Sequence, residues 1–140
     1  FIFMMIFMIS GCMSPPPAGA PGLVVRNRLR VTGPRVSVTV RFVRSMGPGW
    51  LVVHEEEEGA PGRVTGYTHV PDGLSENVII DIDPGPGPRT EAFYVMLHKD
   101  AGEEGVYEFP GADGPVTKGG KVLMERVYLA RPAVKGDIYP

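Results

Sequence analysis

Residues 35–43, RVSVTVRFV, alternate between apolar and polar side chains and indicate the fold class of the whole chain. The apolar positions recur at every second residue, which is the period of a half-buried β-strand and not of a helix. Most of them are β-branched or aromatic, and such residues favour strands. We therefore expect Val36, Val38, Val40 and Phe42 to face a common core.

The same alternation recurs along the chain and is interrupted by clusters of glycine, proline and aspartate, which favour turns. The further runs lie at residues 23–31, 49–55, 63–70, 76–83, 91–99 and 121–130. No stretch has a helical period. The sequence predicts an all-β fold, an antiparallel immunoglobulin-like or cupredoxin-like β-sandwich of about seven strands.

Composition limits the protein to a few classes. The 140 residues suit one domain, and 43% apolar with 21% charged residues is ordinary for a globular chain. A formal net charge of −2 gives no indication of a nucleic-acid partner. The single cysteine excludes an internal disulfide and a zinc site built from several thiolates.

Residues 1–9 are wholly apolar, about as long as the hydrophobic region of a signal peptide and too short to span a bilayer. The following row, Ile9-Ser10-Gly11-Cys12, resembles the lipobox of bacterial lipoproteins. The resemblance implies that Cys12 is acylated and that residues 1–11, a signal-peptide remnant, are removed. Because no basic region precedes the apolar run, we expect a sequence truncated at its start. The alternative is a buried core cysteine.

Residues 12–22, the lipidated cysteine and a proline- and glycine-rich stretch, are expected to form a semi-rigid tether. We expect the β-sandwich to span residues 23–131 and a C-terminal tail to span residues 132–140. The predicted location is extracytoplasmic, on a membrane anchor at the periplasmic or outer surface.

A wider resemblance rests on spaced motifs. GWLVVH at residues 49–54 precedes GAPGRVTG, and LHKD at residues 97–100 precedes GVYEFPGADGP. Roughly from Val31 to Leu129, the chain resembles an uncharacterised domain of archaeal and bacterial surface proteins. The resemblance implies a secreted or cell-surface β-sandwich with no established activity.

We find no catalytic motif: no nucleophile elbow surrounds a serine, and no glycine loop has the context of a phosphate site. His54, His69 and His98 lie on different expected strands, and Met96 shares a face with His98. A His/Met site for copper is an open alternative on ligand softness. We expect instead that the histidines hydrogen-bond to loops and that no cofactor or transition metal is tightly bound.

A glycine-rich acidic loop follows residue 99. Its candidate ligands for Ca²⁺ are Asp100, Glu103, Glu104 and Asp113, since oxygen ligands in a tight loop suit this ion. Relatives in the resembled family have a loop richer in Asp and Asn, whereas Ala101 and Gly102 stand here. We expect a structured, solvated acidic turn with at most weak affinity for Ca²⁺.

Charge is distributed unevenly along the chain. Six arginines and no carboxylate lie between Cys12 and His54, and all sixteen acidic residues follow. Arg26, Arg28 and Arg30 are expected on one face of one strand, where they would contact an anionic lipid or partner. The alternative, which we favour, is pairing with acids on neighbouring strands.

Together these features predict a lipid-anchored extracytoplasmic module that binds or scaffolds, as a subunit of a surface or membrane complex. The alternative is a small periplasmic metal-binding protein, with Ca²⁺ at the acidic loop or copper at the His/Met group.

Overall fold

A computed structural model describes residues 13–26, 30–32, 35–83 and 92–128, with residues 30–32 described by their backbone alone. Within this part of the chain there are ten strands and no helix, so the all-β prediction is confirmed. No helix there is long and apolar enough to cross a membrane. The strands are β1 (Gly22–Val25), β2 (Arg30–Thr32), β3 (Arg35–Ser45), β4 (Gly49–Glu57), β5 (Ala60–Val70), β6 (Gly73–Ile82), β7 (Ala92–Lys99), β8 (Thr117–Lys118), β9 (Lys121–Val122) and β10 (Met124–Tyr128).

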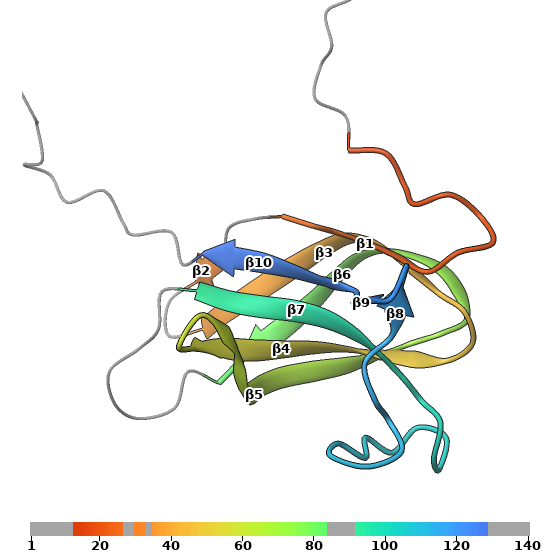
Figure 1. Ribbon diagram of the computed structural model, residues 1–140. Helices are drawn as coiled ribbons and strands as arrows, with labels where there is room; N and C mark the ends of the chain where they lie inside the picture. The colour runs from red at the N-terminus through yellow and green to blue at the C-terminus, as the bar shows by residue number, and fades with distance from the viewer. Residues whose placement is uncertain (1–12, 27–29, 33–34, 84–91, 129–140) are drawn as a thin grey trace, which may run out of the picture.

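The longer strands form two antiparallel sheets packed face to face (Figure 1). In the first sheet β3 is central, with β6 along one edge and β1 and β2 in succession along the other. The second sheet has the order β10-β7-β4-β5. The short strands β8 and β9 pair with each other. The predicted antiparallel sandwich is thus confirmed.

The core lies between the two sheets and follows the alternation seen in the sequence. In the first sheet Val38 is paired with Ile80, and in the second Leu51 is paired with Leu97. All four side chains are buried. The other members of the core are Leu23, Val36, Val40, Val43, Val53, Val70, Ile82, Phe93, Val95 and Val127.

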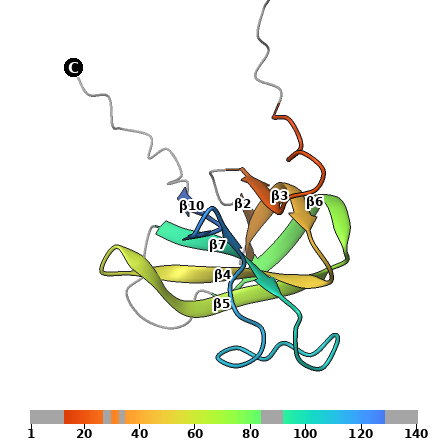
Figure 2. The same cartoon turned by 45° about the vertical axis from the view of Figure 1, so that its right-hand side comes forward.

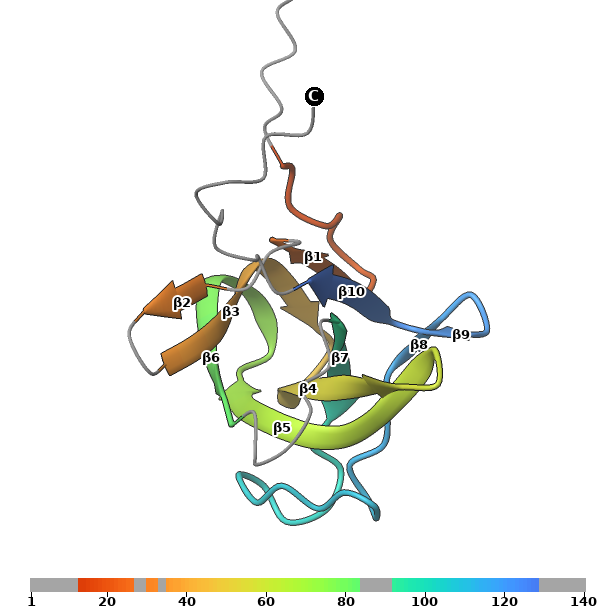
Figure 3. The same cartoon turned by 90° about the vertical axis from the view of Figure 1, so that its left-hand side faces the viewer.

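The sheets approach each other most closely where β5 meets β6. The Asp83 amide donates a hydrogen bond of 2.8 Å to the Thr65 carbonyl and joins the two sheets. Gly66 permits this approach, because a Cβ atom there would lie 2.2 Å from the Asp81 carbonyl oxygen. Viewed along the strands, the two sheets curve into a nearly closed ring (Figure 3).

The arginine-rich run at residues 23–31 is not one continuous strand, contrary to our expectation. β1 ends at Val25, β2 begins at Arg30, and both pair with β3. The pairing of β1 with β3 also shifts register between Val24 and Val25. Arg26 therefore lies beyond the end of β1, while Arg28 lies outside the described residues.

Candidate functional site

The outer face of the second sheet, opposite the core, carries a group of polar and aromatic side chains. Leu51 and Val53 of β4 point into the core, so their neighbours Trp50 and His54 point outward. By the same alternation, β7 turns Tyr94, Met96 and His98 outward. Such a face is usually solvated, yet six side chains on it are buried: Trp50, Val52, His54, Tyr94, Met96 and His98.

Residues 100–113, which follow β7 and which we call the 100–113 loop (Figure 2), pack against the part of this face that carries Trp50, His54 and His98. The ends of this loop are held together by a hydrogen bond of 3.0 Å from the Lys99 amide to the Gly114 carbonyl. Two of its aromatic rings lie over the sheet. Tyr107 packs against Tyr67 and Trp50, at centroid distances of 4.4 and 5.5 Å. Phe109 meets His98 edge-on at 4.8 Å.

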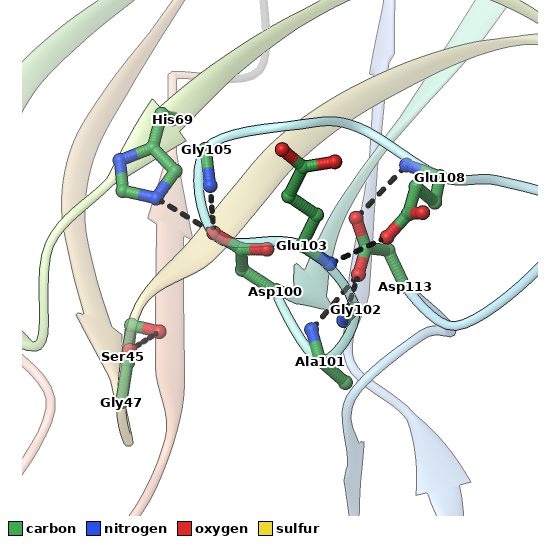
Figure 4. Close-up of polar contacts among 10 residues, drawn as sticks. All are labelled: Ser45, Gly47, His69, Asp100, Ala101, Gly102, Glu103, Gly105, Glu108 and Asp113. Carbon is green, nitrogen blue, oxygen red and sulfur yellow. Dashed lines mark hydrogen bonds and ion pairs between the residues drawn. The ribbon is translucent and has the colours of Figure 1, made fainter.

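Two aspartates organise the loop from within (Figure 4). Asp113 accepts backbone N–H groups from Ala101 at 2.8 Å and Gly102 at 3.2 Å through Oδ1, and from Glu108 at 2.9 Å through Oδ2. Asp100 Oδ2 accepts the Gly105 amide at 2.8 Å. These carboxylates therefore satisfy the N–H groups of a loop that has no regular secondary structure.

His69 of β5, whose side chain is partly exposed, links the loop to the sheet. Its Nε2 lies 3.2 Å from Oδ2 of Asp100, whose side chain is fully buried. The His69 ring also meets Trp50 edge-on, with centroids 4.9 Å apart. The loop is thus held by both polar and aromatic contacts.

His54 and His98 lie together beneath the loop, although 44 positions separate them in the sequence. Their rings stack with centroids 5.7 Å apart and planes inclined by 25°. Nδ1 of His54 lies 2.9 Å from the Gly62 carbonyl oxygen, and Nδ1 of His98 lies 2.8 Å from that of Asp113. Because a carbonyl oxygen only accepts, each Nδ1 carries a proton, and Nε2 is the nitrogen that holds the lone pair in the uncharged form of each ring.

Neither of these Nε2 atoms has a hydrogen-bond partner among the described residues, and both are buried. The described part of the chain contains three other such side-chain atoms: Nε1 of Trp50, Oδ1 of Asp100 and the hydroxyl of Tyr107. All five belong to the loop or to the sheet face beneath it. Since buried polar groups are nearly always hydrogen-bonded, this concentration marks a site with unused polar capacity.

Burial also changes the protonation of this site. Removal from water, together with the nearby His54, lowers the pKa of His98 below its ordinary value, and the Asp113 carbonyl acts in the opposite direction. Burial also raises the pKa of Tyr107, to about 12, and the nearby Asp113 and Tyr67 act in the same direction. At neutral pH, His98 is therefore an uncharged imidazole and Tyr107 an uncharged phenol.

Asp113 keeps its charge in this setting. Burial acts to raise its pKa, but the amides of Glu108, Ala101 and Gly102 favour the carboxylate, and the net pKa lies below the ordinary value. The site therefore combines the uncharged imidazole of His98 with one nearby negative charge.

The acidic residues proposed from the sequence as ligands for Ca²⁺ do not converge on one point. Asp113 uses both oxygens on backbone amides, while Glu103 and Glu104 have exposed side chains. Among the described residues, no group of three or more His, Cys, Asp or Glu side chains is placed to hold a metal ion. The structure thus shows a structural use for Asp100 and Asp113, the buried pair of this acidic group.

The other residues proposed from the sequence lie elsewhere or outside the described residues. Arg26 directly follows β1, and its side chain is exposed. Arg30 begins β2, with only its backbone described, and no described acid forms an ion pair with Arg26. Cys12 and Arg28 lie outside the described residues.

Sequence reasoning considered the three histidines and Met96, but it did not connect them with Trp50, Tyr107 and Phe109. Trp50 is buried, and it packs on the outer face beneath the loop. One available signal was the Tyr-x-Phe spacing in a loop, which places two apolar rings on a segment otherwise rich in acids and glycine.

With this geometry established, the chain was compared with known proteins. Residues 30–129 match the family described as a domain of unknown function, DUF7282. The chain belongs to this family. No curated protein and no solved structure matches it. The match covers almost the same span as the resemblance found in the sequence, and it includes the histidine pair and the 100–113 loop.

Proposed function

We propose that this chain is a lipid-anchored extracytoplasmic domain that binds or scaffolds other molecules and catalyses no reaction. The support from the sequence is the lipobox-like row ending at Cys12. The support from the fold is a small sandwich in which the segment following this cysteine has a defined attachment site.

That attachment is the observation that carries the proposal. Pro16 is buried, and the Arg44 side chain donates two hydrogen bonds to its carbonyl oxygen, from Nε at 3.2 Å and from Nη2 at 3.1 Å. Gly22 makes room for it, because a Cβ atom there would lie 2.2 Å from Cβ of Pro16. Residues 13–21 are therefore not a free tether throughout their length.

The attachment limits how far the domain can lie from a membrane. Four residue steps separate Cys12 from Pro16, and a fully extended chain covers at most about 14 Å over that length. An acylated Cys12 would hold the sandwich near the lipid surface with β1 and β3 close to the anchor. The membrane is thus the first partner. Arg26, together with Arg28 and Arg30, is the group that would contact an anionic headgroup or a protein partner.

Intact-mass measurement of the protein purified from native membranes tests the anchor. We expect a chain that begins at Cys12 and carries acyl groups, and we expect Cys12→Ser to move the protein into the soluble fraction. Ser14→Ala, two positions away, is the matched control and should leave the protein in the membrane. A free Cys12 thiol, or retention of residues 1–11, would contradict the proposal.

A further inference from the structure

We infer that His54, His98 and Met96 form a binding site for a soft monovalent cation, Cu(I), beneath the 100–113 loop. The inference is independent of the proposed anchor, because none of these residues takes part in the Pro16 attachment. It also departs from our expectation that no transition metal is bound, for reasons that only the folded chain provides.

The first reason is the state of the two imidazole rings. Each ring donates Nδ1–H to a backbone carbonyl, and each has a buried Nε2 atom without a hydrogen-bond partner. A metal-binding histidine typically has this arrangement, with one nitrogen oriented by a carbonyl and the other free to coordinate. The carbonyls of Gly62 and Asp113 thus fix both tautomers in the form that binds a metal.

The second reason is the placement of Met96. In the pairing of β4 with β7, Met96 lies opposite Val52, one outward position from His98 along β7 and diagonal to His54. The three side chains share one buried face, and diagonal neighbours on a sheet are within reach of long side chains. A thioether is thereby added to the two nitrogens. Phe109 lies edge-on to both rings and separates them from solvent.

The ligand set selects the cation. No third His, Cys, Asp or Glu joins the pair in the described part of the chain, which disfavours ions that need four or more hard donors. Imidazole together with thioether suits Cu(I). The ligands are all neutral, and the desolvation cost of an ion rises with the square of its charge, so a single positive charge is favoured.

The competing explanation is an ordered water. A water molecule could donate to the two Nε2 atoms and accept from Nε1 of Trp50 and the Tyr107 hydroxyl, which would satisfy four of the five buried polar atoms. Added metal should shift the Nε2 resonances if the site binds a cation, and it should leave them unchanged if the site holds only a water. One titration therefore distinguishes the two explanations.

The probe is Ag(I), which mimics Cu(I) without changing oxidation state. It is added to the full chain carrying Cys12→Ser, so that no thiol competes, and the histidine ring nitrogens are followed by NMR. We expect one equivalent to shift Nε2 of both His54 and His98 and to leave His69 unchanged. Unchanged Nε2 resonances of the pair would overturn the inference. This NMR measurement requires no substitution within the site.

Affinity for Cu(I), measured anaerobically against a competing chelator, tests each ligand. In His54→Asn and His98→Asn the amide nitrogen can still donate to the carbonyl, but Nε2 is lost, and we expect about 100-fold weaker binding or more. Met96→Leu preserves volume and should weaken binding about 10-fold. The matched control, Met46→Leu, changes an exposed methionine between β3 and β4 and should bind as the parent does. Equal losses in the control and the site variants would contradict the assignment.

Discussion

Both carboxylate oxygens of Asp113 accept backbone amides of the 100–113 loop, and their negative charge strengthens these hydrogen bonds. Asp113→Asn replaces one acceptor oxygen with an N–H donor facing an N–H group. We therefore expect faster hydrogen exchange at the amides of Ala101, Gly102 and Glu108, with the amides of β3 unaffected. NMR-detected exchange at neutral pH measures this difference.

The pKa of Asp113 also gives the pH dependence. Its folded-state pKa is depressed below the ordinary value of an aspartate. Its contribution to stability is therefore fully present above that value and is lost as pH falls through the folded pKa. Loop protection in the parent should decrease below about pH 4, whereas in Asp113→Asn it should vary less over this range. Glu104→Gln, a change at an exposed side chain, is the control. A parent-like acid profile in Asp113→Asn would contradict the role given to this residue.

At the scale of elements, the contact of β5 with β6 depends on the missing side chain of Gly66. An added Cβ would lie 2.2 Å from the Asp81 carbonyl oxygen, which is a backbone atom and cannot rotate away. We expect Gly66→Ala to lower the free energy of unfolding by about 1–3 kcal/mol through this overlap. Denaturant unfolding measures the change.

The control for this prediction is Gly114→Ala, where the nearest atom, Cε of Lys99, lies at an ordinary 3.9 Å. Its stability should remain close to that of the parent. If both glycine variants unfold at the same denaturant concentration, then the close approach of β5 to β6 does not limit stability.

The elements also show what the sequence could predict. The alternation of Val36, Val38 and Val40 correctly predicted a core face, because period-two burial is a local property of a strand. The break between β1 and β2 was not predicted, since it depends on register with β3, a distant partner. The grouping of the histidines beneath the loop was likewise not predicted, because it too depends on pairing between distant strands. His54 and His98 become neighbours only through the pairing of β4 with β7, and no local pattern in either strand reveals that pairing.

At the scale of the whole molecule, the strands carry two separate features: a site beneath the loop on the second sheet, and an attachment of residues 13–21 on the first. If Cys12 is acylated, the attachment determines the orientation of the sandwich relative to the membrane, because Pro16 is fixed against β1 within a few residues of the anchor. A domain held in this way would have a preferred orientation, which a free tether would not provide.

Gly22→Ala tests this orientation. The added Cβ would meet Cβ of Pro16 at 2.2 Å and its Cγ at 2.6 Å, so Pro16 must leave and the Arg44 hydrogen bonds are lost with it. We expect faster proteolysis within residues 13–21 and a loss of about 0.5–1.5 kcal/mol in unfolding free energy, the typical contribution of a hydrogen bond. Arg44→Gln, which removes the guanidinium without adding a clash, should act in the same direction. If Gly22→Ala leaves the cleavage rate unchanged, Pro16 does not fix the segment, and the domain would move freely about its anchor.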